Sequence, residues 1–277
     1  MESERMEIER PPVFIVGMPR SGSTAFHRVL ARHPEVATTT RVTRKAPVVY
    51  PALWVLARMT RDHSPGEAGS MWNRYLRGDS DVMTEADLTP EARAYYRKAV
   101  ANVLKLYGRT LFVAKCPRLG LRMRYLEEIF PEARFLHLIR DARAVVRSVL
   151  ERRDHAGDRM TWWDMKPEGW RKWAALDPFE AVAHQWTEVV GYISSCGARL
   201  PAERYLEIRY EDFTADPIQT MRRTAEFCEI AWSGGTLDEA IRSIRSRNAK
   251  WAGEFSPAEE AQILAITSLT MKAKGYL

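Results

Sequence analysis

The feature that most constrains this chain is a short apolar run that leads into a loop of glycine and hydroxyl residues. Val13 to Val16 is continuously apolar, which is typical of a strand buried on both faces of a sheet. The loop Gly17 to Thr24 follows, and the amphipathic segment Ala25 to His33 then predicts a helix. This order directs backbone N–H groups and the positive end of a helix dipole toward one point. The sequence therefore predicts an anion site, most simply for a phosphate.

The loop has the glycine spacing of a triphosphate-binding loop but lacks its lysine. Gly17 and Gly22 keep the spacing and Thr24 keeps the hydroxyl, whereas Ser23 stands at the lysine position. Arg20 supplies a cation inside the loop instead, where its guanidinium can reach a phosphate oxygen. The alternative is a plain turn between a core strand and a helix that binds nothing.

Composition and charge narrow the class of protein. The 277 residues are 45% apolar and 28% charged, as in a globular protein with a sizeable core. A net charge of +6 fits a small anionic ligand better than nucleic acid. Three widely spaced cysteines predict neither a disulfide framework nor a metal site. No run of about eighteen apolar residues occurs, so we expect no membrane span and a cytoplasmic protein.

Further apolar runs predict an α/β fold with parallel strands. The predicted strands after the first are Thr110 to Ala114, Arg134 to Ile139 and Arg204 to Phe213. Helix starts are predicted at Thr89-Pro90, Asp177-Pro178, Asp216-Pro217 and Ser256-Pro257. Strands that alternate with helices predict a three-layer, P-loop-like fold in which a mostly parallel central sheet is flanked by helices.

We expect one domain. Residues 1–10 read as a charged tail, and 11–277 as a single domain with helical or loop cover segments at about 46–109 and 153–177. Such covers commonly form the wall against which an acceptor substrate is held. The residues named for the first cover are Trp54, Met59, Met71, Trp72 and Tyr75. The tryptophan-rich second cover is either a packed surface loop or part of an aromatic acceptor pocket.

Two cations follow predicted strands. Lys115 ends the second strand and Arg140 follows the third, so both belong to the carboxyl edge where open α/β sheets bind ligands. Ser148 lies eight residues beyond Arg140 on a predicted helix, so the two side chains can meet on one phosphate. The alternative is that Arg140 only stabilises the fold through Asp141.

Together these segments resemble the sulfotransferases that use 3′-phosphoadenosine 5′-phosphosulfate (PAPS). Pro19 to Thr24 resembles the family's 5′-phosphosulfate loop. Leu138 to Ser148 resembles its 3′-phosphate motif, with Arg140 and Ser148 at the matching positions. The likeness is to the arginine-loop branch, which includes tyrosylprotein sulfotransferases and many bacterial enzymes, and it extends from about Pro12 to Trp251.

The resemblance implies a role for each matching residue. Lys115 resembles the lysine that assists transfer, Tyr210 the tyrosine near the adenine, and Lys250 a late phosphate contact. Arg247 and Arg152 are further candidates for the same phosphate. The expected catalytic residues are Arg20 and Lys115. The expected donor-binding residues are Arg20, Ser21, Gly22, Ser23, Thr24, Arg140, Ser148, Tyr210, Arg247 and Lys250.

The implied reaction is an in-line, metal-independent transfer of the sulfuryl group from PAPS to a hydroxyl of a small-molecule acceptor, or less often to an amine. The product is adenosine 3′,5′-bisphosphate (PAP). As in phosphoryl transfer, a loose transition state requires positioning and charge stabilisation. The expected partner is the acceptor, with no nucleic acid, and a homo-oligomer is left open. Two alternatives remain: a nucleotide kinase or hydrolase with a degenerate loop, and a non-catalytic protein that binds only the bisphosphate.

The chain departs from family patterns where a general base is expected. Pro117 stands where cytosolic sulfotransferases have a histidine, and Thr38 to Arg41 has no acid where tyrosylprotein enzymes have a glutamate. The basic residues Arg41, Arg44 and Lys45 form either a solvated turn or a substrate contact. The base is therefore unassigned among Asp62, His63, Glu85, Asp87 and His155.

Overall fold

The structure is a computed structural model that describes residues 8–40, 65–155, 162–231, 236–242, 244, 246 and 253–277. Several residues named from the sequence lie outside this part of the chain: Arg41, Arg44, Lys45, Trp54, Met59, Asp62, His63, Arg247 and Lys250. The side chain of His155 lies outside it as well.

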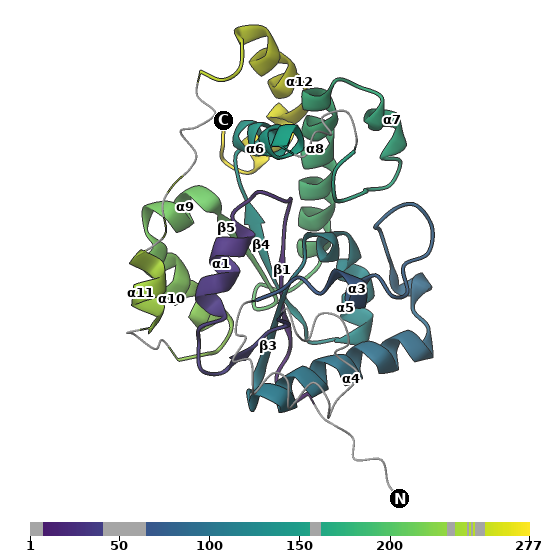
Figure 1. Cartoon of the computed structure of the whole chain (residues 1–277), viewed down its shortest axis with the longest axis vertical. Coiled ribbons are helices and arrows are strands. Elements are labelled where there is room, and N and C mark those ends of the chain that lie inside the picture. Colours follow the sequence, from purple (N-terminus) through teal and green to yellow (C-terminus); the bar gives the residue numbers. More distant parts are fainter. Residues whose placement is uncertain are drawn as a thin grey trace, which may run out of the picture.

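A parallel sheet forms the centre of the fold, as predicted (Figure 1). Its strand order is β2-β3-β1-β4-β5, and every neighbouring pair is parallel. The strands are β1 (Val13–Val16), β2 (Val36–Ala37), β3 (Leu111–Lys115), β4 (Arg134–Ile139) and β5 (Tyr205–Arg209). Because all five run in one direction, the loops that follow their last residues lie at the same edge.

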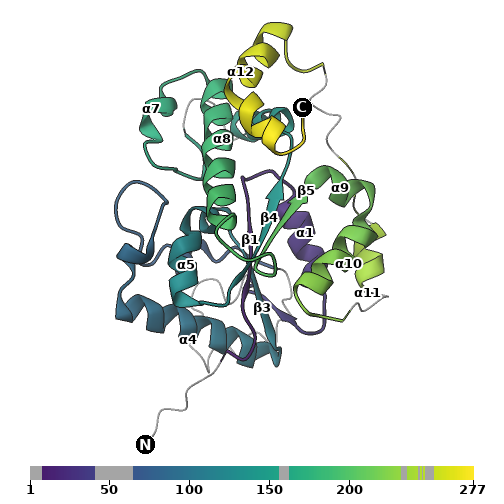
Figure 2. The same ribbon diagram turned by 180° about the vertical axis from the view of Figure 1, so that it is seen from behind.

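Helices cover both faces of the sheet, which gives the three layers predicted (Figures 1 and 2). Val13 and Ile15 of β1 face one apolar cluster, and Phe14 and Val16 face the other, as the period of two requires. The first cluster lies against α1 (Ser23–Leu30), α9 (Tyr210–Ala215), α10 (Pro217–Phe227) and α11 (Thr236–Arg242). The second lies against α4 (Pro90–Tyr107), α5 (Met123–Ile129), α6 (Ala142–His155), α8 (Pro178–Gly197) and α12 (Pro257–Ala273).

Short elements complete the described chain: α3 (Gly69–Trp72), the 3₁₀ turns η1 (Glu85–Asp87) and η2 (Pro117–Arg122), and α7 (Arg171–Ala174). No helix in the described ranges has both the length and the apolar character needed to cross a membrane.

The predicted helix starts are confirmed. Thr89 Oγ1 accepts a hydrogen bond of 3.2 Å from the N–H of Ala92, and the carboxylate of Asp216 caps α10 in the same way. Ser256 and Glu259 form a reciprocal capping box at the start of α12.

The predicted strand over Arg204 to Phe213 is wrong in its second half. β5 ends at Arg209, and α9 begins at Tyr210. Glu211 and Asp212 favour a helix start because their charges complement the positive end of the helix dipole. Tyr210 and Phe213 are both buried, a spacing of three that fits a helix rather than a strand.

Part of the first predicted cover belongs to the core. Trp72 is buried, and its ring lies 5.8 Å from that of Phe14 and 5.4 Å from that of Tyr96. Met71 is buried in the same cluster. The prediction that Met71 and Trp72 form an acceptor wall is therefore wrong, because both residues fill the space between the sheet and α4.

The described part of the tryptophan-rich cover is a packed segment. Trp170 donates a hydrogen bond to the Asp79 carboxylate at 2.9 Å, and Trp162 donates to the Met165 carbonyl at 2.9 Å. The side-chain amide of Gln185 on α8 also donates to the Met165 carbonyl. These indole N–H groups are used within the protein, which favours the packed-loop interpretation.

We predict that Phe14→Ala destabilises the protein strongly, because Phe14 is fully buried against the rings of Trp72, Phe130 and Phe135. The expected loss is about 3–5 kcal/mol in the free energy of unfolding, measured by denaturant titration. Leu269→Ala is the control, because Leu269 on α12 is 82% exposed and should lose almost nothing. Equal losses in the two variants would contradict this packing.

We also predict that stability falls as the pH drops below about 6.5. Burial, and secondarily the charge of Lys115, lowers the pKa of His27 from 6.5 to about 3. Below pH 6.5 the unfolded chain therefore binds a proton that the folded protein excludes, so unfolding becomes more favourable. In His27→Gln the slope of unfolding free energy against pH should shrink by up to about 1.4 kcal/mol per pH unit between pH 6 and 4. An unchanged slope would show that His27 titrates normally in the folded state.

Candidate active site

The loop after β1 has a shape that depends on glycine. Gly17 has φ +144°, and a Cβ there would lie 2.3 Å from the Leu138 carbonyl oxygen of β4. Gly22 has φ +85°, and a Cβ there would lie 2.3 Å from Cδ2 of the Tyr210 ring. Both positions exclude a side chain, so the loop lies directly against β4 and Tyr210.

The start of α1 has groups available for an anion. Gly22 occupies the N-cap position and supplies no side-chain cap, so the first N–H groups of α1 are not satisfied by a capping side chain. Ser21 Oγ is fully buried and has no hydrogen-bond partner within the described part of the chain. A buried hydroxyl without a partner is costly, and a ligand oxygen at this point would satisfy it.

The structure brings together the predicted residues of the two motifs. Arg20 Nε donates a hydrogen bond of 3.0 Å to Ser148 Oγ on α6. Arg140 donates one of 3.0 Å to the Arg20 carbonyl, and its guanidinium lies 4.5 Å from the centre of the Tyr210 ring. Residues from the ends of β1, β4 and β5 thus meet in one cluster with Gly22.

Arg140 is a buried cation with fixed surroundings. It is 7% exposed, and burial lowers the pKa of its guanidinium, opposed by Tyr210 and the nearby carboxylates. An arginine remains protonated despite such a shift. Its own carbonyl accepts a hydrogen bond of 3.1 Å from Trp186 Nε1 on α8. The alternative in which Arg140 only stabilises the fold through Asp141 does not account for the hydrogen bond between Arg140 and the Arg20 carbonyl in the loop.

Lys115 occupies the end of β3 and forms an ion pair with Glu67. Lys115 is 5% exposed, whereas the Glu67 side chain is 53% exposed. The neighbouring backbone is held in place, since Gly66 N–H donates to the Thr39 carbonyl at 2.7 Å and Thr39 Oγ1 donates to the Gly66 carbonyl at 2.8 Å. A carboxylate that faces solvent thus contacts the lysine of the site.

Sequence reasoning missed Glu67. Its position depends on pairing between Thr39 and Gly66, which are 27 residues apart in the chain. No local pattern signals this pairing. Of the earlier candidates for a base, Glu85 pairs with Arg124, and Asp87 forms the capping box with Thr84.

A second carboxylate missed by sequence reasoning is that of Asp164. Asp164 Oδ1 lies 3.3 Å from Arg118 Nε, and burial raises the pKa of Asp164. Glu67 raises that pKa further, while Lys115 opposes it. Asp81 lies 3.5 Å from the same Arg118 nitrogen. The region beside Lys115 therefore holds carboxylates and cations together.

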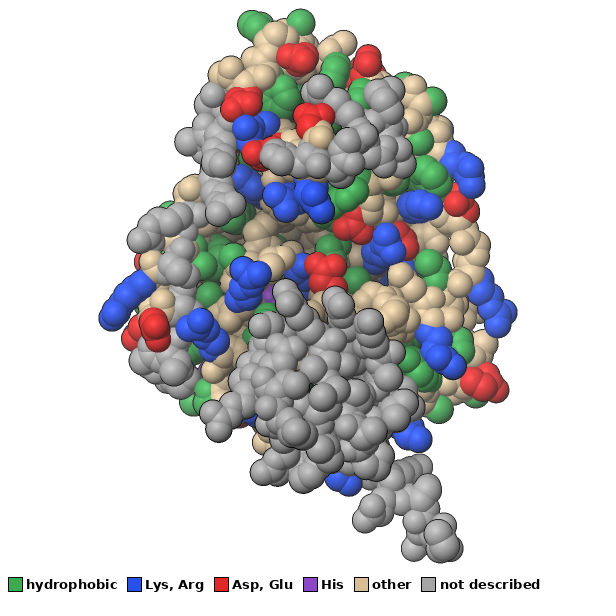
Figure 3. All heavy atoms as spheres, in the orientation of Figure 1, with side chains coloured by type: hydrophobic (Ala, Val, Ile, Leu, Met, Phe, Trp, Pro, Cys, Tyr) green, Lys and Arg blue, Asp and Glu red, His purple; other side chains and the backbone are tan. Residues whose placement is uncertain are grey.

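The space-filling view agrees with this mixture (Figure 3). Lys, Arg, Asp and Glu side chains gather in the hollow across the middle of the face, between the grey segments. No group of three or more histidine, cysteine, aspartate or glutamate side chains is arranged for a metal ion within the described ranges.

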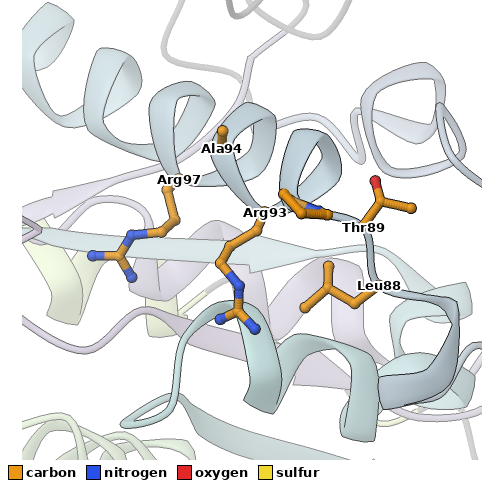
Figure 4. Close-up of a pocket in the computed structure, with 6 residues that line it drawn as sticks. Leu88, Thr89, Arg93, Ala94 and Arg97 are labelled. Carbon is orange, nitrogen blue, oxygen red and sulfur yellow. The ribbon is translucent and has the colours of Figure 1, made fainter.

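A hollow of about 340 Å³ lies elsewhere, at the N-terminal end of α4 (Figure 4). Its arginines are already engaged, because Arg93 donates to the Glu128 carbonyl and Arg97 donates to the Ile129 carbonyl at 3.2 Å. The hollow is lined by Leu88, Thr89, Pro90, Arg93, Ala94 and Arg97. It contains none of the predicted site residues.

Comparisons with known proteins agree on one family. The protein-tyrosine sulfotransferase A of Caenorhabditis elegans is 26% identical over 237 residues, which cover 82% of this chain and 52% of that protein. The omega-hydroxy-beta-dihydromenaquinone-9 sulfotransferase Stf3 of Mycobacterium tuberculosis is 25% identical over 78% of this chain and 62% of its own length. This chain thus spans little more than half the length of these two relatives.

A solved structure shows a similar fold. The crystal structure of sulfotransferase STF9 from Mycobacterium avium superposes with a TM-score of 0.63 at 15% identity, and covers 95% of this chain and 76% of that one. This likeness supports the fold alone. The family model described as "Sulfotransferase family" matches residues 11–234, which is most of the sequence. The chain therefore belongs to the sulfotransferase family.

Proposed function

We propose that this protein transfers a sulfuryl group from PAPS to an acceptor hydroxyl. The observation that carries the proposal is the meeting of Arg20, Arg140 and Ser148 at the start of α1, beside the buried, unpartnered hydroxyl of Ser21. The ion pair of Lys115 and Glu67 lies at the end of β3, which is the neighbour of β1 in the sheet.

The residues present fit a bisphosphate nucleotide. The uncapped start of α1 and the Ser21 hydroxyl suit the 5′-phosphosulfate, together with Gly22, Ser23 and Thr24. Arg140 and Ser148 suit the 3′-phosphate, and the Tyr210 ring beside Arg140 suits the adenine. Arg247 and Lys250 lie outside the described residues, and their contacts with the phosphate remain predictions from the sequence.

Side chains of this protein can stabilise the charge that develops during the transfer and can remove the acceptor proton. PAPS supplies an activated sulfuryl group on a bridging phosphate oxygen, which takes the electron pair of the broken S–O bond as the acceptor O–S bond forms. Lys115 and Arg20 place positive charge where that charge develops. The Glu67 carboxylate, in contact with Lys115, takes the proton from the acceptor hydroxyl. Lys115 thereby holds Glu67 at the reacting centre.

The acceptor is proposed to be a small molecule that bears a hydroxyl. The names of both relatives refer to an acceptor that bears a hydroxyl, since one names a tyrosine and the other an omega-hydroxy menaquinone derivative. The other result that an acceptor screen can give is transfer to a tyrosine of a protein. A panel of alcohols, phenols and tyrosine peptides with labelled PAPS separates the two.

We predict that PAP stabilises the protein and that ATP with magnesium does not. At a concentration one hundred times its dissociation constant, PAP should raise the free energy of unfolding by about 2.7 kcal/mol. This corresponds to an increase of roughly 5–10 °C in the melting temperature. Scanning calorimetry with each ligand measures this. A larger shift with ATP and magnesium would favour a kinase or hydrolase.

Arg140→Ala should weaken PAP binding at least about tenfold in calorimetric titration, because it removes a buried cation. The matched control is Arg134→Ala, at the opposite end of the same strand, where the guanidinium contacts Phe227 and Glu229. PAP affinity should be unchanged in the control. Equal affinity in both variants would remove Arg140 from the site.

We predict that Glu67→Gln lowers the transfer rate constant roughly 10²- to 10⁴-fold, because the amide cannot accept the acceptor proton. PAP affinity should stay within about twofold, measured by calorimetric titration. Glu85→Gln is the control, because Glu85 pairs with Arg124 and should retain activity. If Glu67→Gln retains the wild-type rate, another group removes the proton.

A further inference from the structure

The last residues of the chain contact the segment that carries the proposed adenine contact. Tyr276, beyond the end of α12, donates a hydrogen bond of 2.8 Å from its hydroxyl to Glu211 Oε2. Glu211 directly follows Tyr210. The guanidinium of Arg209, which directly precedes Tyr210, lies 4.4 Å from the centre of the Tyr276 ring. Tyr276 therefore contacts both chain neighbours of Tyr210.

The same carboxylate reaches the segment that carries Arg140. Glu211 Oε1 accepts a hydrogen bond of 3.2 Å from the N–H of Asp141, the residue after Arg140. One glutamate thus joins the ends of β4 and β5, and its second oxygen is held by Tyr276. A carboxylate with both oxygens engaged has a fixed orientation.

A second link runs from the start of α12 to the same place. Arg143 donates to the Asp141 carboxylate at 2.8 Å and to Glu260 Oε1 at 3.1 Å. Glu260 lies in the first turn of α12, so the start of this helix is linked through Arg143 to Asp141, the residue after Arg140. Figures 1 and 2 show α12 lying across α6 and α8.

The end of α12 is also attached to the sheet. Lys274 donates to Glu207 Oε1 at 2.5 Å, and Glu207 belongs to β5. The same carboxylate accepts from the Tyr205 hydroxyl at 2.7 Å. Burial, then the charge of Glu211, raises the pKa of Tyr276, so its hydroxyl stays protonated and remains a donor. The C-terminal residues thus form a defined part of this edge of the sheet.

We propose that Tyr276 is a positioning residue for the nucleotide, acting through Glu211 on the segments that carry Tyr210 and Arg140. This proposal rests on the proposed function, in which Tyr210 and Arg140 bind the bisphosphate nucleotide. The reason is geometric. The Tyr210 ring must lie against Gly22 and beneath Arg140, and Glu211 fixes the backbone on both sides of that contact.

The test is Tyr276→Phe, which keeps the ring over Arg209 and removes only the hydroxyl. PAP affinity in calorimetric titration should fall about tenfold, as expected for loss of a hydrogen bond to a charged group. With an acceptor in hand, the donor KM should rise by a similar factor while kcat stays within about twofold. Loss of folded protein would instead lower kcat and leave KM unchanged.

Two controls separate positioning from general stability. Tyr96→Phe removes a buried hydroxyl that donates to the Trp72 carbonyl at 3.0 Å, so it should lower the melting temperature without changing PAP affinity. Glu211→Gln and the double variant Glu211→Gln, Tyr276→Phe complete a cycle. The effects on PAP affinity should be strongly non-additive, because Tyr276 acts through Glu211.

Reciprocity provides a second measurement. If Tyr276 favours nucleotide binding, PAP must in turn protect residues 270–277 from hydrogen exchange. Wild-type affinity for PAP in Tyr276→Phe, with no added protection of residues 270–277, would overturn the proposal. Absence of PAP binding to the wild-type protein would instead reject the proposed function, so the two failures are distinguishable.

Discussion

The site depends on the buried guanidinium of Arg140. It donates to the Arg20 carbonyl and lies over the Tyr210 ring, and the Trp186 indole holds the Arg140 carbonyl. One cation thus joins the loop after β1 to the end of β5, with α8 behind it. Arg20 has φ +72°, an uncommon conformation that this contact supports. A buried arginine requires such partners, so the same contacts that satisfy Arg140 also shape the loop.

Charge is distributed differently here than in a triphosphate loop. The lysine position holds Ser23, and the cations come from Arg20 within the loop, Arg140 after β4 and Lys115 at the end of β3. Because parallel strands end at one edge, cations far apart in the chain come to the same edge of the sheet. Lys115 additionally contacts a carboxylate, which gives the acceptor side of the proposed site a group that can accept a proton.

Short sequence patterns predicted many of the strands and helix starts of this protein. The apolar runs of β1, β3 and β4 and the caps of α4, α10 and α12 were predictable, since a buried strand and a capped helix each have a pattern within a few residues. The end of β5 was predicted wrongly because Tyr210 to Phe213 was read as a continuation of the strand, whereas the buried pair Tyr210 and Phe213 has the spacing of a helix. Glu67 could not be predicted, since it reaches Lys115 only through the pairing of Thr39 with Gly66. Contacts of that kind arise from the folded chain rather than from spacing.

The sequence by itself determined that a strand, a glycine-containing loop and a helix follow one another, from which it predicted an anion site, and that Lys115 and Arg140 belong to the same edge of the sheet. It did so because strand polarity and helix dipoles are properties of short segments. Only the tertiary structure decided which carboxylate contacts Lys115, and that Glu211 and Tyr276 connect the end of the chain to the segments beside Arg140 and Tyr210. Those contacts join side chains that are distant in sequence, and their geometry exists only once the sheet and its helices are packed.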